Sequence, residues 1–128
     1  MSVPGILPIT LEVGPLPENP LAAAAEFHAE VLPRVLAMAD DLWLAGLDPT
    51  SHVTLVFAPA DHLHRAWREA AIQTIARECA PIRINAVASV DEAALAAATA
   101  WLAGAPGVTG QFLTLDSHGA GAVLASES

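Results

Sequence analysis

The chain has 128 residues, which is enough for one domain and too few for two full hydrophobic cores. Its apolar fraction of 54% excludes a disordered chain, because burial of this much apolar surface can offset the conformational entropy lost on folding. The formal net charge is −9, and all five basic residues are arginines. These values exclude a nucleic-acid groove or an anionic-lipid surface as the partner class.

The use of cysteine, lysine and tyrosine limits the chemistry further. The single cysteine, Cys79, cannot form an intramolecular disulfide, and no Cys/His spacing typical of a zinc site occurs. The 128 residues include no tyrosine and no lysine, so the chain cannot supply a phenolate or an ε-amine to a mechanism. The N-terminus lacks the basic region of a signal peptide, and no apolar run of about eighteen residues predicts a membrane span. We therefore expect a cytoplasmic protein that binds neither metal nor membrane.

The first part of the chain predicts a strand followed by a long helix. Residues 6–13 are rich in β-formers, although Pro8 belongs at a strand start or on an edge strand. A loop rich in proline and glycine follows over 14–20. From residue 21 to about 46, apolar side chains recur at the i, i+3, i+4 spacing of a helix with one buried face. Pro33 lies inside this pattern and predicts a kink or the start of a second segment.

The middle of the chain predicts a second unit of strand and helix. Residues 53–57 form a short apolar run of β-formers between turn residues, which is typical of a buried strand. Asp61 is predicted to cap the N-terminus of a helix over 62–79. An apolar stripe runs along that helix from Trp67 to Cys79, so we expect Cys79 to be a small core residue.

The last part predicts one more helix between two strands. Residues 82–87 indicate a second buried strand. Ser89 and Glu92 have the spacing of a capping box, and an alanine-rich helix follows that ends near residue 104. The remaining elements are a strand over 111–115 and an irregular tail over 117–128.

The order of these elements predicts the fold class. Four strands alternate with helices and lack the polar alternation of a half-exposed sheet, which indicates a parallel sheet covered on both faces. We therefore expect an α/β protein: a single domain over 1–128, built as a small three-layer sandwich with a mostly parallel sheet of about four strands.

Two segments resemble a known family. The run Ala76-Arg77-Glu78-Cys79-Ala80-Pro81, continued by Ile82-Arg83-Ile84-Asn85-Ala86-Val87, is similar to the helix-to-strand segment of the short-chain dehydrogenases/reductases. Residues 100–102 and 108–116 resemble the closing helix and strand of that family. The resemblance implies a truncated domain like the carboxyl half of a Rossmann-type dehydrogenase, without the glycine-rich loop that binds the nicotinamide nucleotide.

The resemblance also locates the family's catalytic positions. Counted back from the block at 76–81, Arg65 falls at the lysine position and Asp61 at the tyrosine position. No serine occurs over 57–59, where the family has its catalytic serine. We therefore predict no catalytic, cofactor-binding or metal-binding residue and no cofactor. The resemblance retains only fold-supporting positions, which are Asn85, Thr109, Gly110 and Asp116.

The most polar cluster, at 61–65, has two interpretations. Two imidazoles and a carboxylate close together suggest a metal or acid/base site. However, His62 and His64 are two residues apart and face away from each other on a helix. We favour a solvated helix start, and we keep a small-ligand activity of this cluster as an alternative.

The tryptophans suggest how the protein acts. Trp43, Trp67 and Trp101 occur one per predicted helix, and tryptophan is enriched at protein interfaces. In the resembled family, the helices that match 21–46 and 62–79 pack against another subunit, so we predict interface residues at Trp43, Trp67, Ala71 and Trp101. The expected protein is a non-catalytic structural or interaction subunit, either a homodimer or a heteromer with a full-length dehydrogenase. An oxidoreductase subunit that completes a shared active site is the alternative.

Overall fold

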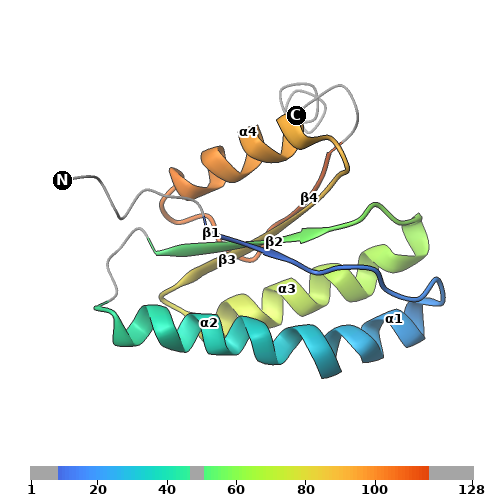
Figure 1. The fold of residues 1–128 in the computed structure, drawn as a ribbon, viewed down its shortest axis with the longest axis horizontal. Helices are drawn as coiled ribbons and strands as arrows, with labels where there is room; N and C mark the ends of the chain where they lie inside the picture. The colour runs from blue at the N-terminus through green and yellow to red at the C-terminus, as the bar shows by residue number, and fades with distance from the viewer. Residues whose placement is uncertain (1–8, 47–50, 116–128) are drawn as a thin grey trace.

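The computed structural model describes residues 9–46 and 51–115 of the chain. Its centre is a sheet of four parallel strands in the order β1-β2-β3-β4, which confirms the predicted α/β class (Figure 1). Pro8, Asp116 and the predicted tail lie outside the described residues. The strands are β1 (Ile9–Glu12), β2 (His52–Phe57), β3 (Arg83–Ala88) and β4 (Phe112–Thr114).

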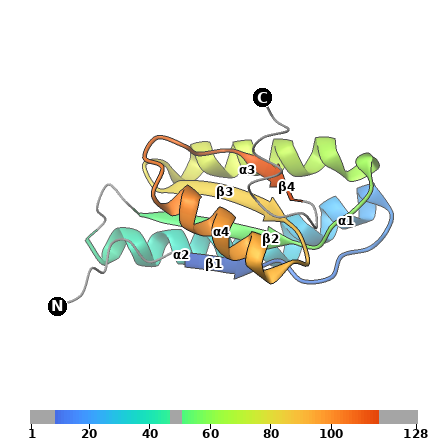
Figure 2. The same ribbon diagram turned by 90° about the horizontal axis from the view of Figure 1, so that it is seen from above.

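Helices cover both faces of the sheet. The segments α1 (Pro20–Glu26), α2 (Leu32–Leu44) and α3 (Arg65–Cys79) lie on one face, and α4 (Glu92–Ala103) lies on the other (Figures 1 and 2). Every residue of β2 and β3 is buried, because these strands are central in the sheet and have helices on both sides. The three-layer arrangement follows the predicted order of elements, with strand ends shifted by one to three residues.

Pro33 is accommodated without breaking the long helical segment. A π-helical turn, η2 (Phe27–Val31), joins α1 to α2, and the Leu32 N–H donates to the Phe27 carbonyl five residues back. Pro33 then lies in the first turn of α2, where the missing N–H leaves no bond unmade. The predicted kink or restart is therefore observed as one wide turn between two α-helical pieces.

The two later helices begin at aspartates. The Asp61 side chain accepts a hydrogen bond from the Leu63 N–H at 3.0 Å, which confirms it as a cap, and the first turn is a 3₁₀ turn, η3 (His62–His64). The predicted capping box at Ser89 was wrong. Asp91 caps α4 through bonds from the N–H groups at 93 and 94, and the Ser89 hydroxyl accepts from the Asp91 N–H. An aspartate one residue before the helix is already a strong cap.

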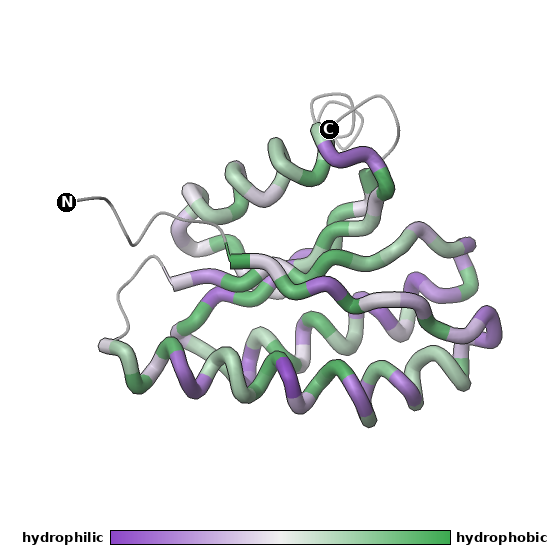
Figure 3. Tube along the Cα trace, viewed as in Figure 1, coloured by the Kyte–Doolittle hydropathy of each residue, from purple (hydrophilic) through white to green (hydrophobic). Residues whose placement is uncertain are grey.

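The hydrophobic core has one part on each face of the sheet. The larger part lies under α1, α2 and α3, where the rings of Phe27 and Phe57 stack at 5.6 Å between centroids. The smaller part lies under α4 and contains Leu102. The central strands are mostly apolar, the helices below the sheet alternate between apolar and polar residues, and α4 is mostly apolar (Figure 3). Cys79 is buried as predicted, and burial, followed by the charges of Glu78 and Asp40, raises the pKa of its thiol.

Candidate functional site

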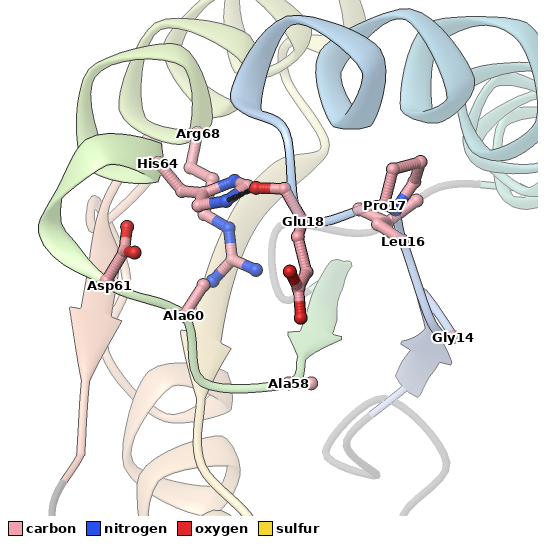
Figure 4. Close-up of a pocket in the computed structure, with 9 residues that line it drawn as sticks. All are labelled: Gly14, Leu16, Pro17, Glu18, Ala58, Ala60, Asp61, His64 and Arg68. Atoms are coloured by element: carbon pink, nitrogen blue, oxygen red, sulfur yellow. Dashed lines mark hydrogen bonds between the residues drawn. The ribbon is translucent and has the colours of Figure 1, made fainter.

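A cavity of about 440 Å³ opens at the carboxyl ends of β1 and β2. In open α/β sheets, this end of the strands is where ligands bind. The loop after β1 forms one wall, and the loop after β2 together with the start of α3 forms the other (Figure 4). Its lining residues are Gly14, Leu16, Pro17, Glu18, Ala58, Ala60, Asp61, His64 and Arg68.

Local sequence shapes the first wall. Gly14 has φ +84°, a conformation that a side chain would strain, and it turns the chain away from the sheet. Asn19 then caps α1, since its Oδ1 accepts from the Ala22 N–H at 3.0 Å. The short loop between these two points carries Glu18, whose carboxylate faces the cavity (Figure 4).

His64 is fixed by hydrogen bonds of both ring nitrogens. The Trp67 Nε1–H donates to Nδ1 at 3.1 Å, so Nδ1 is an acceptor. Nε2 therefore carries the proton and donates to the Glu18 carbonyl at 2.9 Å. These bonds tie α3 to the loop after β1 and leave no nitrogen of His64 free to bind a ligand.

The other residues of the polar cluster lie at the surface. His62 and Arg65 are exposed, whereas His64 is buried. The cluster lines a smaller cavity of about 160 Å³ near the end of β4. Within 9–46 and 51–115, no group of three His, Cys, Asp or Glu side chains lies close enough to hold a metal ion.

Arg68 is the functional candidate that the sequence reasoning missed. It is 7% exposed, and its guanidinium lies over the Phe57 ring with 4.7 Å from Cζ to the centroid. Its Nε has no hydrogen-bond partner among the residues that the structure describes. Burial lowers the pKa of this guanidinium from its ordinary value. The signal was its spacing: Arg68 precedes the core residues Ile72 and Ile75 by one and two helical turns.

A second polar cluster lies inside the sheet, away from the cavity. The Asn85 Nδ2 donates to the His52 Nε2 at 3.0 Å and to the Val108 carbonyl at 2.9 Å, and its Oδ1 accepts from the Gln111 N–H. Burial, and secondly the charge of Arg83, lowers the pKa of His52 to about 4. This cluster fixes the loop that leads into β4.

The fold-supporting positions taken from the resemblance meet at the same place. The Thr109 Oγ1 accepts from the Ile84 N–H at 3.0 Å, and the Gly110 N–H donates to the Ile84 carbonyl at 2.7 Å. Gly110 has φ +78°, so the turn into β4 favours glycine. Asn85, Thr109 and Gly110 therefore support the fold, as the resemblance implies.

The four predicted interface residues fall into two groups. Trp43 on α2 and Trp101 on α4 are 59% and 48% exposed. Trp67 is half-buried, and its ring contacts Phe27 at 5.5 Å between centroids. Ala71 is buried against the sheet of its own chain. Contact with a second subunit thus stays a prediction for all four residues, of which Trp67 and Ala71 also pack against the core of their own chain.

Comparison with protein families identifies the family of the chain. The family model described as SDR-like, short chain dehydrogenase-like protein, matches residues 11–115. No curated protein and no solved structure matches the chain. None of the described helices is long and apolar enough to cross a bilayer.

Proposed function

Because the chain belongs to the short-chain dehydrogenase-like family, we propose that it is a non-catalytic subunit that acts by binding a second subunit. The second subunit is another copy of the chain or a full-length dehydrogenase. The proposal includes a cytoplasmic location, since a single cysteine suits a reducing compartment.

The observation that carries the proposal is the use of Asp61. This residue falls at the position of the family's tyrosine, yet its carboxylate serves as a helix cap for η3. Arg65, at the lysine position, is exposed, and Ala58 occupies the loop where the family has a serine. A carboxylate that accepts a backbone N–H cannot replace a phenol as proton donor. The residues at the family's catalytic positions therefore support a structural role and not a catalytic one.

The outer surface at the end of α2 supports the binding role. Trp43 is joined there by Leu36 and by Leu44, which is 82% exposed. Leu36 and Trp43 border a groove of about 470 Å³ between α2 and the end of α3. An exposed tryptophan beside exposed leucines is typical of a protein–protein contact. A symmetric dimer would bury this patch against its own copy, which is the commonest arrangement of homo-oligomers.

The test is the mass of the purified protein at micromolar concentration, measured by light scattering. We expect a species of twice 13.2 kDa. Trp43→Glu should give a monomer, because a carboxylate at the centre of an apolar contact loses its hydration. Leu21→Glu is the matched control: Leu21 is an exposed leucine at the other end of the same helical segment, and this variant should stay dimeric.

Two further outcomes separate the alternatives. If Trp101→Glu rather than Trp43→Glu yields the monomer, α4 forms the interface. If the protein alone is a 13.2 kDa monomer, the untagged chain should co-purify with a full-length dehydrogenase from its host. A monomer that co-purifies with none, or a purified chain that oxidises or reduces substrates with nicotinamide nucleotides, contradicts the proposal.

A further inference from the structure

We propose that Arg68 binds the carboxylate of a small organic acid inside the 440 Å³ cavity at the carboxyl ends of β1 and β2. This inference does not rest on the subunit proposal, because it concerns a different surface and a different class of partner. It begins with the charge of Arg68.

Arg68 is a buried cation that forms no ion pair with a described residue, although the carboxylates of Glu18 and Asp61 line the same cavity. It is 7% exposed, and it makes no hydrogen bond or ion pair with any residue that the structure describes. A charge removed from water is costly unless it is paired. The ring of Phe57 at 4.7 Å and that of Phe112 at 5.7 Å offset part of this cost through their π faces. Aromatic faces satisfy no N–H donor, so the guanidinium retains its capacity for an anion.

The guanidinium is directed into the cavity. Figure 4 shows its terminal nitrogens pointing away from α3 into the space between Ala60 and Glu18. The Trp67 ring lies next to the guanidinium, with 6.0 Å between Arg68 Cζ and the ring centroid. A hydrogen bond from the Trp67 Nε1–H to His64 fixes this ring in turn. A guanidinium held in one orientation presents two parallel N–H donors, which match the two oxygens of a carboxylate.

The walls of the cavity select the kind of anion. Leu16, Pro17 and Ala58 supply apolar surface, and the volume of about 440 Å³ exceeds what a single ion fills. Glu18 and Asp61 also line the cavity, and their carboxylates disfavour a ligand with two negative charges. A monocarboxylate with a short hydrocarbon body therefore fits better than a phosphate group.

The first experiment observes Arg68 in the unaltered protein. The chain has five arginines and no lysine, so an ¹⁵N spectrum of the arginine Nε–H groups contains few signals. Hexanoate is added at constant ionic strength, with chloride as the reference anion. We expect the Arg68 signal to shift along a saturable curve with a dissociation constant of about 1 mM or lower. An Arg68 signal that stays unmoved up to about 50 mM hexanoate overturns the proposal, since a site with a dissociation constant of about 1 mM is almost fully occupied at that concentration.

The second experiment separates the carboxylate from other anions and from surface binding. Calorimetry with acetate, butyrate, hexanoate and inorganic phosphate should show binding that tightens up to about fifteenfold for each added pair of methylenes, the limit for complete burial of both. Phosphate binding that equals or exceeds hexanoate binding overturns the assigned ligand class.

Variants then locate the site. Arg68→Leu should abolish hexanoate binding, whereas the matched control Arg65→Leu, which removes an exposed arginine three residues earlier on α3, should retain it. Equal binding by both variants refutes the site. If Arg68→Leu does not fold, the shift of the Arg68 signal in the unaltered protein decides the question.

Discussion

His52 should make the protein lose stability in mild acid. The imidazole is 2% exposed, and burial together with Arg83 lowers its pKa from 6.5 to about 4. In the unfolded chain the imidazole takes up a proton as the pH falls below 6.5, whereas in the folded chain it stays neutral until about 4. The stabilising contribution is therefore complete above pH 6.5 and is lost as the pH falls through this window.

The magnitude follows from the two pKa values. With an unfolded value of 6.5 and a folded value of about 4, acidification from pH 7.5 to 4.5 should remove roughly 2 to 3 kcal/mol from the free energy of unfolding. That is a large part of the stability of a domain of this size. Other groups titrate over the same range, so the measurement must isolate His52.

The assay is urea unfolding of the parent and of His52→Gln at both pH values. The variant removes the titrating group and retains an amide oxygen that can accept a hydrogen bond. We expect it to be less stable than the parent near neutrality and to lose roughly 2 to 3 kcal/mol less on acidification. The control is His62→Gln, which removes an exposed imidazole and should follow the parent. Equal acid sensitivity of the parent and His52→Gln would refute the reasoning.

Two further predictions concern single side chains, and a third concerns nucleotide binding. Asp61→Ala should lower the free energy of unfolding by about 1 kcal/mol, because the helix loses its cap, and added zinc should not change this value. If zinc instead raises the stability of the parent but not of the variant, Asp61 belongs to a metal site. Arg83→Met should destabilise by about 2 kcal/mol or more in urea titrations, because its guanidinium donates to the Leu102, Ala103 and Ala105 carbonyls at the end of α4. Calorimetry of the isolated chain with NAD(H) or NADP(H) should show no dissociation constant as low as about 1 μM; such a value would contradict the proposed lack of cofactor binding.

Local sequence determined the order and type of the elements. The alternation of apolar runs with helical periodicity is a short-range pattern, so it placed β2, α3 and β3 to within a few residues. Asp61 was identified as a cap for the same reason, because capping depends on the residues immediately after it. The exception was Ser89, where two capping residues stood two positions apart and the helix began at the later one.

The tertiary structure decided which side chains meet. His52 and Asn85 are 33 residues apart and meet because β2 and β3 pair in parallel register, which no local pattern specifies. Trp67, predicted at an interface from its residue type, packs on Phe27 within its own chain, which no local pattern specifies. Arg68 has the spacing of a buried residue and the chemistry of an exposed one. The packing of α3 against the sheet shows that Arg68 is buried. The apolar residues of α3 orient the helix toward the sheet, and every other residue on the same face, including Arg68, is therefore buried as well.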